Sequence, residues 1–448
     1  QIVSRETIWA PRTLLALAAV GLLAVTAAAC TRAPSPQGWA PPQPVMANNQ
    51  QLVIAAHKAK LYALPPTVTT ATWQFPPVDK NSYPVATVEA ALLDSMVDAL
   101  SVSADQKTSL HTKVKNLNIQ GPSVKDLKDA IKASGASSTD QTRLNDAVDS
   151  TTNADKAAIS SPQAFYGDIG VSADSQTVFA ASFRGYVFAL DSATGHMVWE
   201  QKVGSEMIGG VAVDGNTVFF GSKGKQIFAA DAKTGHNNWT FDAQGEVWST
   251  PTVADGTLYV TSLDGTVYSL NESGKQLWTF KNANAGIAGA ATVAGDAVYV
   301  GAFDNKLYSI KTSDGTMNWS YAAGNWFWGA VKVKDAVVYA ANLDGKVYAV
   351  DDATGKLKWD HDTGSPVRSS PTVAGGALIV ANKAGQVQKL NLSSGQSMGS
   401  PYNAGSTIYA NLTSLGDNTV YVSPQSPQLV VLDASGDLKV DSSYGLAQ

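Results

Sequence analysis

The sequence contains a short motif that returns about every 40 residues and ends in tryptophan. Five consecutive copies end at Trp199, Trp239, Trp278, Trp319 and Trp359, so the steps between them are 40, 39, 41 and 40 residues. Each copy holds short runs that alternate apolar and polar residues between glycine turns, which is typical of β-strands. A fixed period of this length predicts a β-propeller built from four-stranded blades.

The repeat at residues 247–280 shows the four strands of one blade clearly. Alternating residues predict strands at 247–255, 257–262, 266–270 and 276–280. Asp264-Gly265 separates the second and third strands, and this dipeptide is a strong hairpin signal because glycine accepts positive φ at low cost. Other repeats carry a similar pair in the same place: Arg184-Gly185, Asp304-Asn305 and Asp344-Gly345.

Weaker repeats at both ends raise the count to eight. Residues 51–64 followed by Trp73 form a degraded first copy, and 377–390 and 419–432 give two further sets without the closing tryptophan. The sequence therefore predicts an all-β protein, an eight-bladed β-propeller of four-stranded antiparallel blades. Seven blades plus a separate terminal strand pair is the alternative. The predicted blades are 39–77, 164–204, 205–244, 245–283, 284–324, 325–364, 365–404 and 405–445.

Residues 78–163, between the first and second blades, have a different pattern. Apolar residues there follow helical spacing, and together they predict a small α-helical insertion of four short helices. Three capping boxes mark helix starts. They are Ser103/Gln106, Ser123/Asp126 and Ser138/Gln141. The insertion is either a decoration packed on the rim of the propeller or a module that docks a partner protein.

The first 29 residues predict an export signal. Arg5 and Arg12 precede an apolar run at 13–29, which ends in small residues directly before Cys30. Cys30 is the only cysteine, so it has no intramolecular disulfide partner, and its place resembles the lipid attachment site of a bacterial lipoprotein. Residues 30–38 then form the lipidated cysteine and a Pro/Ser-rich tether. The alternative is a chance cysteine at the end of an uncleaved signal anchor.

Charge and motif content exclude several classes of function. The formal net charge is −5 and no run of Lys or Arg occurs, so nucleic acid is not an expected partner. The five histidines do not fall in metal-binding spacings, and the sequence lacks the common hydrolase, zinc-protease and phosphate-loop motifs. We therefore expect no catalytic residue, no metal site and no cofactor.

The repeat A-x-D-x-x-T-G-x-x-x-W resembles the PQQ-like propeller repeat. In that family the tryptophan docks between neighbouring blades, which implies a structural docking role for Trp199, Trp239, Trp278, Trp319 and Trp359, and a weaker one for Trp73. A tryptophan suits this role because it buries a large apolar ring and needs one acceptor for its N–H. The resemblance covers nearly all of the chain outside the signal and the insertion.

Quinoprotein dehydrogenases share the repeat and provide an enzymatic alternative. In that family the cofactor and a Ca²⁺ ion lie on the propeller axis, against a tryptophan and a disulfide between adjacent cysteines. This sequence has no Cys-Cys pair, and its single cysteine precedes the propeller. A PQQ-dependent activity is therefore the least favoured interpretation.

A candidate binding patch emerges when the first strands of the repeats are aligned. Trp248, Trp328 and Arg368 fall in one equivalent position, and Trp326 stands two residues before it. Tryptophan and arginine are the residues that anchor protein interfaces. We predict that Trp248, Trp326, Trp328 and Arg368 line a binding patch near the mouth of the propeller axis. The alternative is that they pack against neighbouring blades.

The lipoprotein signal and the single propeller together resemble the BamB family of outer-membrane assembly lipoproteins. The resemblance implies a non-enzymatic, extracytoplasmic scaffold, anchored to a bacterial membrane by its lipid, that binds envelope proteins and takes part in β-barrel assembly. The helical insertion departs from the family pattern and leaves the partner open. A propeller that binds a ligand or polysaccharide through the same aromatic patch is the alternative.

Overall fold

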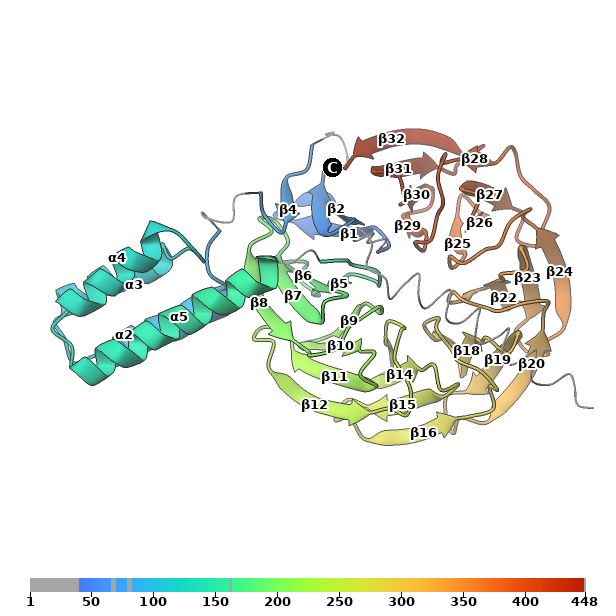
Figure 1. Ribbon diagram of the computed structural model, residues 1–448. Helices are drawn as coiled ribbons and strands as arrows, with labels where there is room; N and C mark the ends of the chain where they lie inside the picture. Colours follow the sequence, from blue (N-terminus) through green and yellow to red (C-terminus); the bar gives the residue numbers. More distant parts are fainter. Residues whose placement is uncertain (1–39, 66–69, 79–82, 161–162, 447–448) are drawn as a thin grey trace, which may run out of the picture.

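The protein is an eight-bladed β-propeller with a helical arm, as a computed structural model shows (Figure 1). The structure describes residues 40–65, 70–78, 83–160 and 163–446, so the predicted signal, Cys30 and the tether lie outside it. Eight four-stranded antiparallel sheets follow one another along the chain, each built from four consecutive strands. The predicted fold class, including the eighth blade and the helical insertion after the first blade, is confirmed.

The strands of the first four blades form simple meanders. Blade 1 is β1 (Gln43–Ala47), β2 (Gln50–His57), β3 (Lys60–Leu64) and β4 (Trp73–Phe75); blade 2 is β5 (Gly170–Val171), β6 (Thr177–Ala181), β7 (Tyr186–Asp191) and β8 (Met197–Lys202). Blade 3 is β9 (Val211–Asp214), β10 (Thr217–Gly221), β11 (Gln226–Asp231) and β12 (Asn237–Asp242); blade 4 is β13 (Thr252–Ala254), β14 (Thr257–Thr261), β15 (Val267–Asn271) and β16 (Gln276–Phe280).

The remaining blades repeat the same order. Blade 5 is β17 (Thr292–Ala294), β18 (Ala297–Gly301), β19 (Lys306–Lys311) and β20 (Met317–Ala322); blade 6 is β21 (Lys332–Lys334), β22 (Val337–Ala341), β23 (Lys346–Asp351) and β24 (Leu357–Asp362). Blade 7 is β25 (Thr372–Ala374), β26 (Ala377–Ala381), β27 (Gln386–Leu390) and β28 (Tyr402–Asn403); blade 8 is β29 (Thr413–Leu415), β30 (Thr419–Val422), β31 (Gln428–Asp433) and β32 (Lys439–Gly445).

Blade 4 shows how local sequence sets the geometry. The second and third strands turn at Gly265, whose φ is +82°, and a Cβ there would lie 2.7 Å from the carbonyl oxygen of Ala283. Only glycine satisfies both conditions. The first strand is shorter than predicted, because it begins at Thr252 and the preceding residues from 247 run along the propeller axis instead.

The core lies between the blades rather than within one layer. The inner strands of every blade are almost fully buried, and each apolar face packs against the next blade. Blade 8 closes the ring against blade 1 through an apolar seam that includes Tyr62, Leu64, Tyr421 and Tyr444. A ring closed in this way has a single toroidal core, which explains why so long a chain needs no division into separate domains.

Four helices form the arm beside blade 2 (Figure 1). They are α2 (Thr87–Asp98), α3 (Ala104–Lys115), α4 (Pro122–Ala133) and α5 (Ser138–Ser160). Their apolar side chains belong to one continuous cluster with residues of blades 1 and 2, including Leu93 of α2 and Phe188 of β7. Within the described ranges, no helix has the length and apolarity that a membrane crossing needs.

Two of the three predicted capping boxes differ in the structure. Ser103 and Gln106 cap α3 reciprocally as predicted. At α4, however, Pro122 occupies the first turn and pre-sets its φ, while the Ser123 hydroxyl accepts from the Asn118 N–H instead. At α5 the capping hydroxyl is that of Ser137, which accepts from the Asp140 N–H at 3.1 Å, one residue earlier than predicted.

Candidate functional site

The repeat tryptophans lie at the interfaces between blades and make the same hydrogen bond each time. Every indole Nε1 donates to a backbone carbonyl in the turn before the last strand of the following blade. The pairs are Trp73–Ser192 (2.9 Å), Trp199–Ala232 (2.9 Å), Trp239–Glu272 (2.8 Å), Trp278–Thr312 (2.8 Å), Trp319–Asp352 (2.7 Å) and Trp359–Leu392 (3.0 Å). These rings position the blades, and they leave the axial face to the first strands.

Blades 7 and 8 meet without a tryptophan. The side chain of Lys389, in β27, is 5% exposed, and its Nζ donates to the carbonyl oxygens of Ala434 at 2.6 Å and Gly436 at 2.8 Å. A long apolar stem with a donor at its end thus supplies both features of the tryptophan contact. The sequence analysis had no pattern from which to predict this contact.

A small cavity of about 130 Å³ lies on the propeller axis. One residue from each blade, at the segment just before the first strand, contributes to its lining. These residues are Pro41, Tyr166, Ile208, Trp248, Ala288, Trp328, Arg368 and Tyr409. The alignment of first strands placed Ile208, Trp248, Trp328 and Arg368 in one position, but it missed Tyr166 and Tyr409 because their spacings are 42 and 41 residues rather than 40.

Four aromatic rings form a continuous cluster at one side of this mouth. Phe303, from the turn between β18 and β19, is 7% exposed and lies beneath the two tryptophans of blade 6. Its ring centroid is 4.7 Å from that of Trp326 and 5.1 Å from that of Trp328. Trp248 adjoins Trp328 at 6.4 Å. Trp326 and Trp328 are partly exposed, whereas Trp248 is 9% exposed.

Arg368 completes the cluster. Its guanidinium carbon lies 4.1 Å from the ring centroid of Trp328 and 5.2 Å from that of Tyr409, which is cation–π geometry. The indole of Trp248 donates to a carboxylate oxygen of Glu246 at 2.7 Å. The structure thus brings together Trp248, Trp328 and Arg368 directly, and joins Trp326 to them through Phe303. We call these five residues the aromatic mouth.

The chemistry of the cavity suits contact rather than catalysis. Its lining includes the hydroxyls of Ser249 and Thr250 and one carboxyl, that of Asp168, whose pKa is raised by burial. No histidine or cysteine lines the described cavity. Side chains of the blades therefore offer apolar surface, indole N–H groups and one guanidinium at this face.

A PQQ cofactor does not fit this axis. The cavity of about 130 Å³ is smaller than the several hundred Å³ of pockets that enclose drug-sized molecules. The sequence also has no pair of adjacent cysteines, since Cys30 is its only one. We derive no chemistry through such a group.

Comparisons with known proteins agree with this geometry. A family model described as "Outer membrane protein assembly factor BamB" matches residues 183–325 and 264–419, together more than half of the chain. The crystal structure of BamB from Moraxella catarrhalis is similar, with 20% identity and a TM-score of 0.54 over 59% of this chain and 83% of that one.

The second similar structure is a designed protein. The computationally designed Ika8 protein has 19% identity and a TM-score of 0.56, over 62% of this chain and 87% of that one. At these identities both likenesses concern the fold alone. No curated protein matches the sequence.

Proposed function

Because the chain belongs to the family described as outer membrane protein assembly factor BamB, we propose that it is a non-enzymatic scaffold of the bacterial cell envelope. Its task is to hold a protein partner during the assembly of outer-membrane β-barrels. The partner is an envelope protein with a soluble domain that reaches the propeller, and nucleic acid has no part in this function.

The aromatic mouth carries the proposal. Trp326, Trp328 and Arg368 are partly exposed at one end of the axis, and residues of these types dominate the binding energy of protein interfaces. Phe303 and Trp248 support them from below and hold the rings in place. A rigid aromatic surface loses little conformational entropy when a partner binds, which favours an interface at this position.

A lipid on Cys30 completes the proposed arrangement. The residue directly follows the apolar run at 13–29, and it is the only cysteine available for a thioether-linked lipid. The anchor would keep the propeller at a membrane surface close to its partner. Replacement of Cys30 by alanine should therefore move the protein from the membrane fraction to the soluble fraction.

Polysaccharide binding is less compatible with the geometry of the mouth. A sugar ring stacks on a free aromatic face, but Trp328 is covered by the Arg368 guanidinium and by Phe303. Trp326 also stacks on Phe303, with an interplanar angle of 26°. A protein surface can use ring edges and the guanidinium together, so we favour a protein partner over a glycan.

Site-specific photo-crosslinking tests the proposal. Asn325 is exposed next to Trp326, so a benzoylphenylalanine at this position samples the partner at the mouth. Leu357, 44% exposed on the outermost strand of the same blade, provides the matched control. Both variants would be made in the lipidated full-length protein, irradiated in intact cells, and analysed by mass spectrometry after solubilisation in detergent.

We expect the probe at position 325 to capture an outer-membrane β-barrel protein with a periplasmic domain, and the probe at 357 to capture it far less. The adduct should be lost when Trp328 or Arg368 is replaced by alanine. Capture of unrelated substrate-binding proteins only, or equal yields from both probes, would contradict the proposal. Retention of the protein on a carbohydrate array through Trp326 would favour the glycan alternative.

A further inference from the structure

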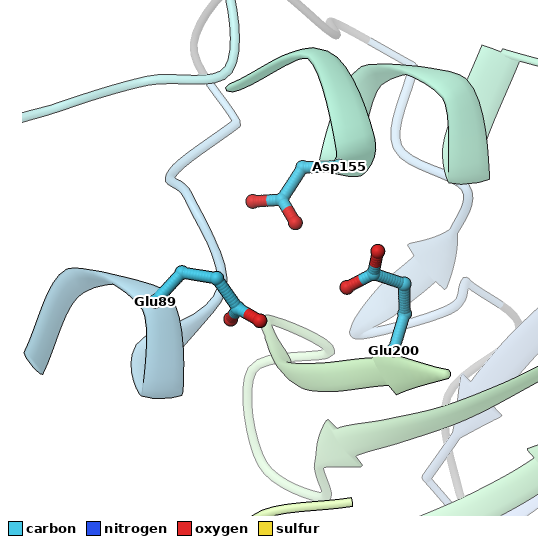
Figure 2. A group of neighbouring side chains, drawn as sticks. All are labelled: Glu89, Asp155 and Glu200. Carbon is cyan, nitrogen blue, oxygen red and sulfur yellow. The ribbon is translucent and has the colours of Figure 1, made fainter. Parts of the chain in front are cut away.

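Three carboxylates meet where the helical arm joins the propeller, far from the aromatic mouth in the sequence. Glu89 lies in the first turn of α2, Asp155 in α5, and Glu200 in β8 of blade 2. Figure 2 shows the three side chains pointing toward one another from these elements. One oxygen of each lies within 4.8 Å of an oxygen of the others. We call this group the carboxylate cluster.

The cluster is sheltered from water and lacks balancing partners. Asp155 is 0% exposed, and only one of its oxygens has a donor, the Ala86 N–H at 2.8 Å. The other oxygen, Oδ1, is buried without a partner, as are Oε2 of Glu89 and Oε2 of Glu200. Three orphaned carboxylate oxygens that converge on one point are unusual, since buried polar atoms are nearly always satisfied.

Other acidic side chains of the arm have cations beside them. Asp149 is paired with Lys128 at 2.5 Å, although it is largely exposed, and Asp94 and Asp98 both contact His111. No lysine or arginine forms an ion pair with the carboxylate cluster in the described part of the chain. The arm therefore neutralises its exposed carboxylates and leaves its most buried ones without a protein cation.

Titration behaviour agrees with a missing positive charge. Burial, followed by repulsion from the neighbouring carboxylates, raises the pKa of Glu200 to about 8. Burial, together with the charge of Glu89, raises the pKa of Asp155 to about 7, although the Ala86 N–H opposes this shift. The basic group nearest to the cluster is the exposed His236, whose charge opposes the burial-driven rise in the pKa of Glu89. Without a cation the cluster must hold protons at neutral pH.

We propose that Glu89, Asp155 and Glu200 bind one hard divalent cation, of the Mg²⁺, Ca²⁺ or Mn²⁺ class, that fastens the helical arm to blade 2. An all-oxygen carboxylate donor set is the one these ions prefer, whereas zinc and copper sites use nitrogen and sulfur. The ion accepts the three orphaned oxygens as ligands and bridges α2, α5 and β8. Water completes its coordination. This site is independent of the aromatic mouth and of the proposed function.

The cation also explains the position of the cluster. Apolar packing already joins the arm to blades 1 and 2, but such packing is non-directional and sets no precise angle. A bound ion with fixed ligand distances from three elements would set the orientation of α2 and α5 relative to β8. The arm would then be ordered when the ion is bound and looser when it is removed.

The test uses the whole mature protein, treated with a chelator and then titrated separately with Mg²⁺, Ca²⁺ and Mn²⁺. Calorimetry and the electron paramagnetic resonance of free Mn²⁺ measure stoichiometry and affinity. Hydrogen–deuterium exchange measures protection of α2 and α5. We expect one saturable site for at least one of these ions, a rise in the thermal unfolding midpoint of several degrees, and slower exchange in both helices.

Two variants locate the site, and a third controls for charge. Asp155→Asn and Glu200→Gln keep the shape of the side chains and should each weaken binding at least tenfold. Asp149→Asn removes an exposed carboxylate from the same helix and should leave the affinity unchanged. Because the wild-type titration alone reports stoichiometry, a variant that fails to fold does not remove the test. Absence of saturable binding at millimolar concentration, or equal affinity in both cluster variants, would overturn the proposal.

Discussion

The indole of Trp199 in blade 2 lies directly on Gly235 in blade 3. A Cβ at Gly235 would stand 2.8 Å from Cδ2 and Cε3 of the ring, and the φ of this glycine is +73°. The threonine-glycine pair of the repeat and the tryptophan of the preceding repeat are therefore one structural unit. The same relationship recurs in Trp73–Gly195, Trp239–Gly274, Trp278–Gly315, Trp319–Gly355 and Trp359–Gly395.

Replacement of Gly235 by alanine should destabilise the propeller more than loss of the positive φ alone explains. Gly215, in the same blade, has a φ of +54° and open space around its Cβ position, so Gly215→Ala is the matched control. We expect about 1–2 kcal/mol for Gly215→Ala from the left-handed backbone. Overpacking against Trp199 should add about 1–3 kcal/mol in Gly235→Ala. Urea midpoints followed by tryptophan fluorescence measure both; equal shifts would contradict the tryptophan–glycine contact.

Replacement of Lys389 by methionine should weaken the joint between blades 7 and 8. Methionine keeps the apolar stem but leaves the Ala434 and Gly436 carbonyl oxygens without the Nζ donor. An orphaned buried acceptor costs about 1–3 kcal/mol. Lys383 is exposed on the turn between β26 and β27, so Lys383→Met should change stability by less than about 0.5 kcal/mol. A Lys389→Met variant as stable as the control would show that these bonds contribute nothing net.

The periodic part of the fold could be predicted because the repeat states it five times. The tryptophan, the Thr-Gly turn and the hairpin glycine all recur at fixed spacing, so blade number and most strands follow from period alone. Prediction weakened where the spacing changed. Tyr166 and Tyr409 were missed at the axial cavity because one or two additional residues precede them.

Contacts made once in the chain left no such signal. Phe303 lies beneath Trp326 and Trp328 because of the way blades 5 and 6 pack, and no sequence pattern links these positions. Glu89 and Asp155 belong to helices whose meeting depends on tertiary structure, and Glu200 lies in a strand between them and blade 2. Neither a metal-ligand spacing nor a charge run marks such a cluster, so the sequence analysis expected no metal site there.

Raising the pH should weaken the contact between α2 and α3. The His111 ring lies 2.7 Å from Asp94 and 3.0 Å from Asp98, and hydrogen bonding to Asp94 is the main cause that raises the pKa of His111 above 6.5. The folded state therefore holds the proton more tightly than the unfolded chain. The resulting stabilisation is fully present below pH 6.5 and disappears as pH rises through the folded pKa.

The size of this effect should be small, because all three side chains are partly exposed. We expect less than about 1 kcal/mol, as for other surface ion pairs. Hydrogen–deuterium exchange in α3 at pH values below and above the transition measures it, once corrected for the intrinsic pH dependence of exchange. His111→Gln provides the control and should show no such transition. A transition that persists in this variant would assign it to another group.

Trp328 and Arg368 should act as one unit in partner binding. The guanidinium lies 4.1 Å from the indole centroid, so removing the ring also removes the surface that positions the cation. Residues in direct contact generally show non-additive effects. We expect Trp328→Ala and Arg368→Ala each to weaken partner capture at least tenfold. The double variant should lose little more than Trp328→Ala alone.

A double-mutant cycle, measured as the yield of the crosslink from position 325, quantifies this coupling. Trp359→Phe, on the outer strand of the same blade, serves as the control because it lies at a blade interface rather than at the mouth. It should leave the yield unchanged. If the losses from Trp328→Ala and Arg368→Ala simply added, the two side chains would bind the partner independently. The cation–π contact would then have no role in presenting the arginine.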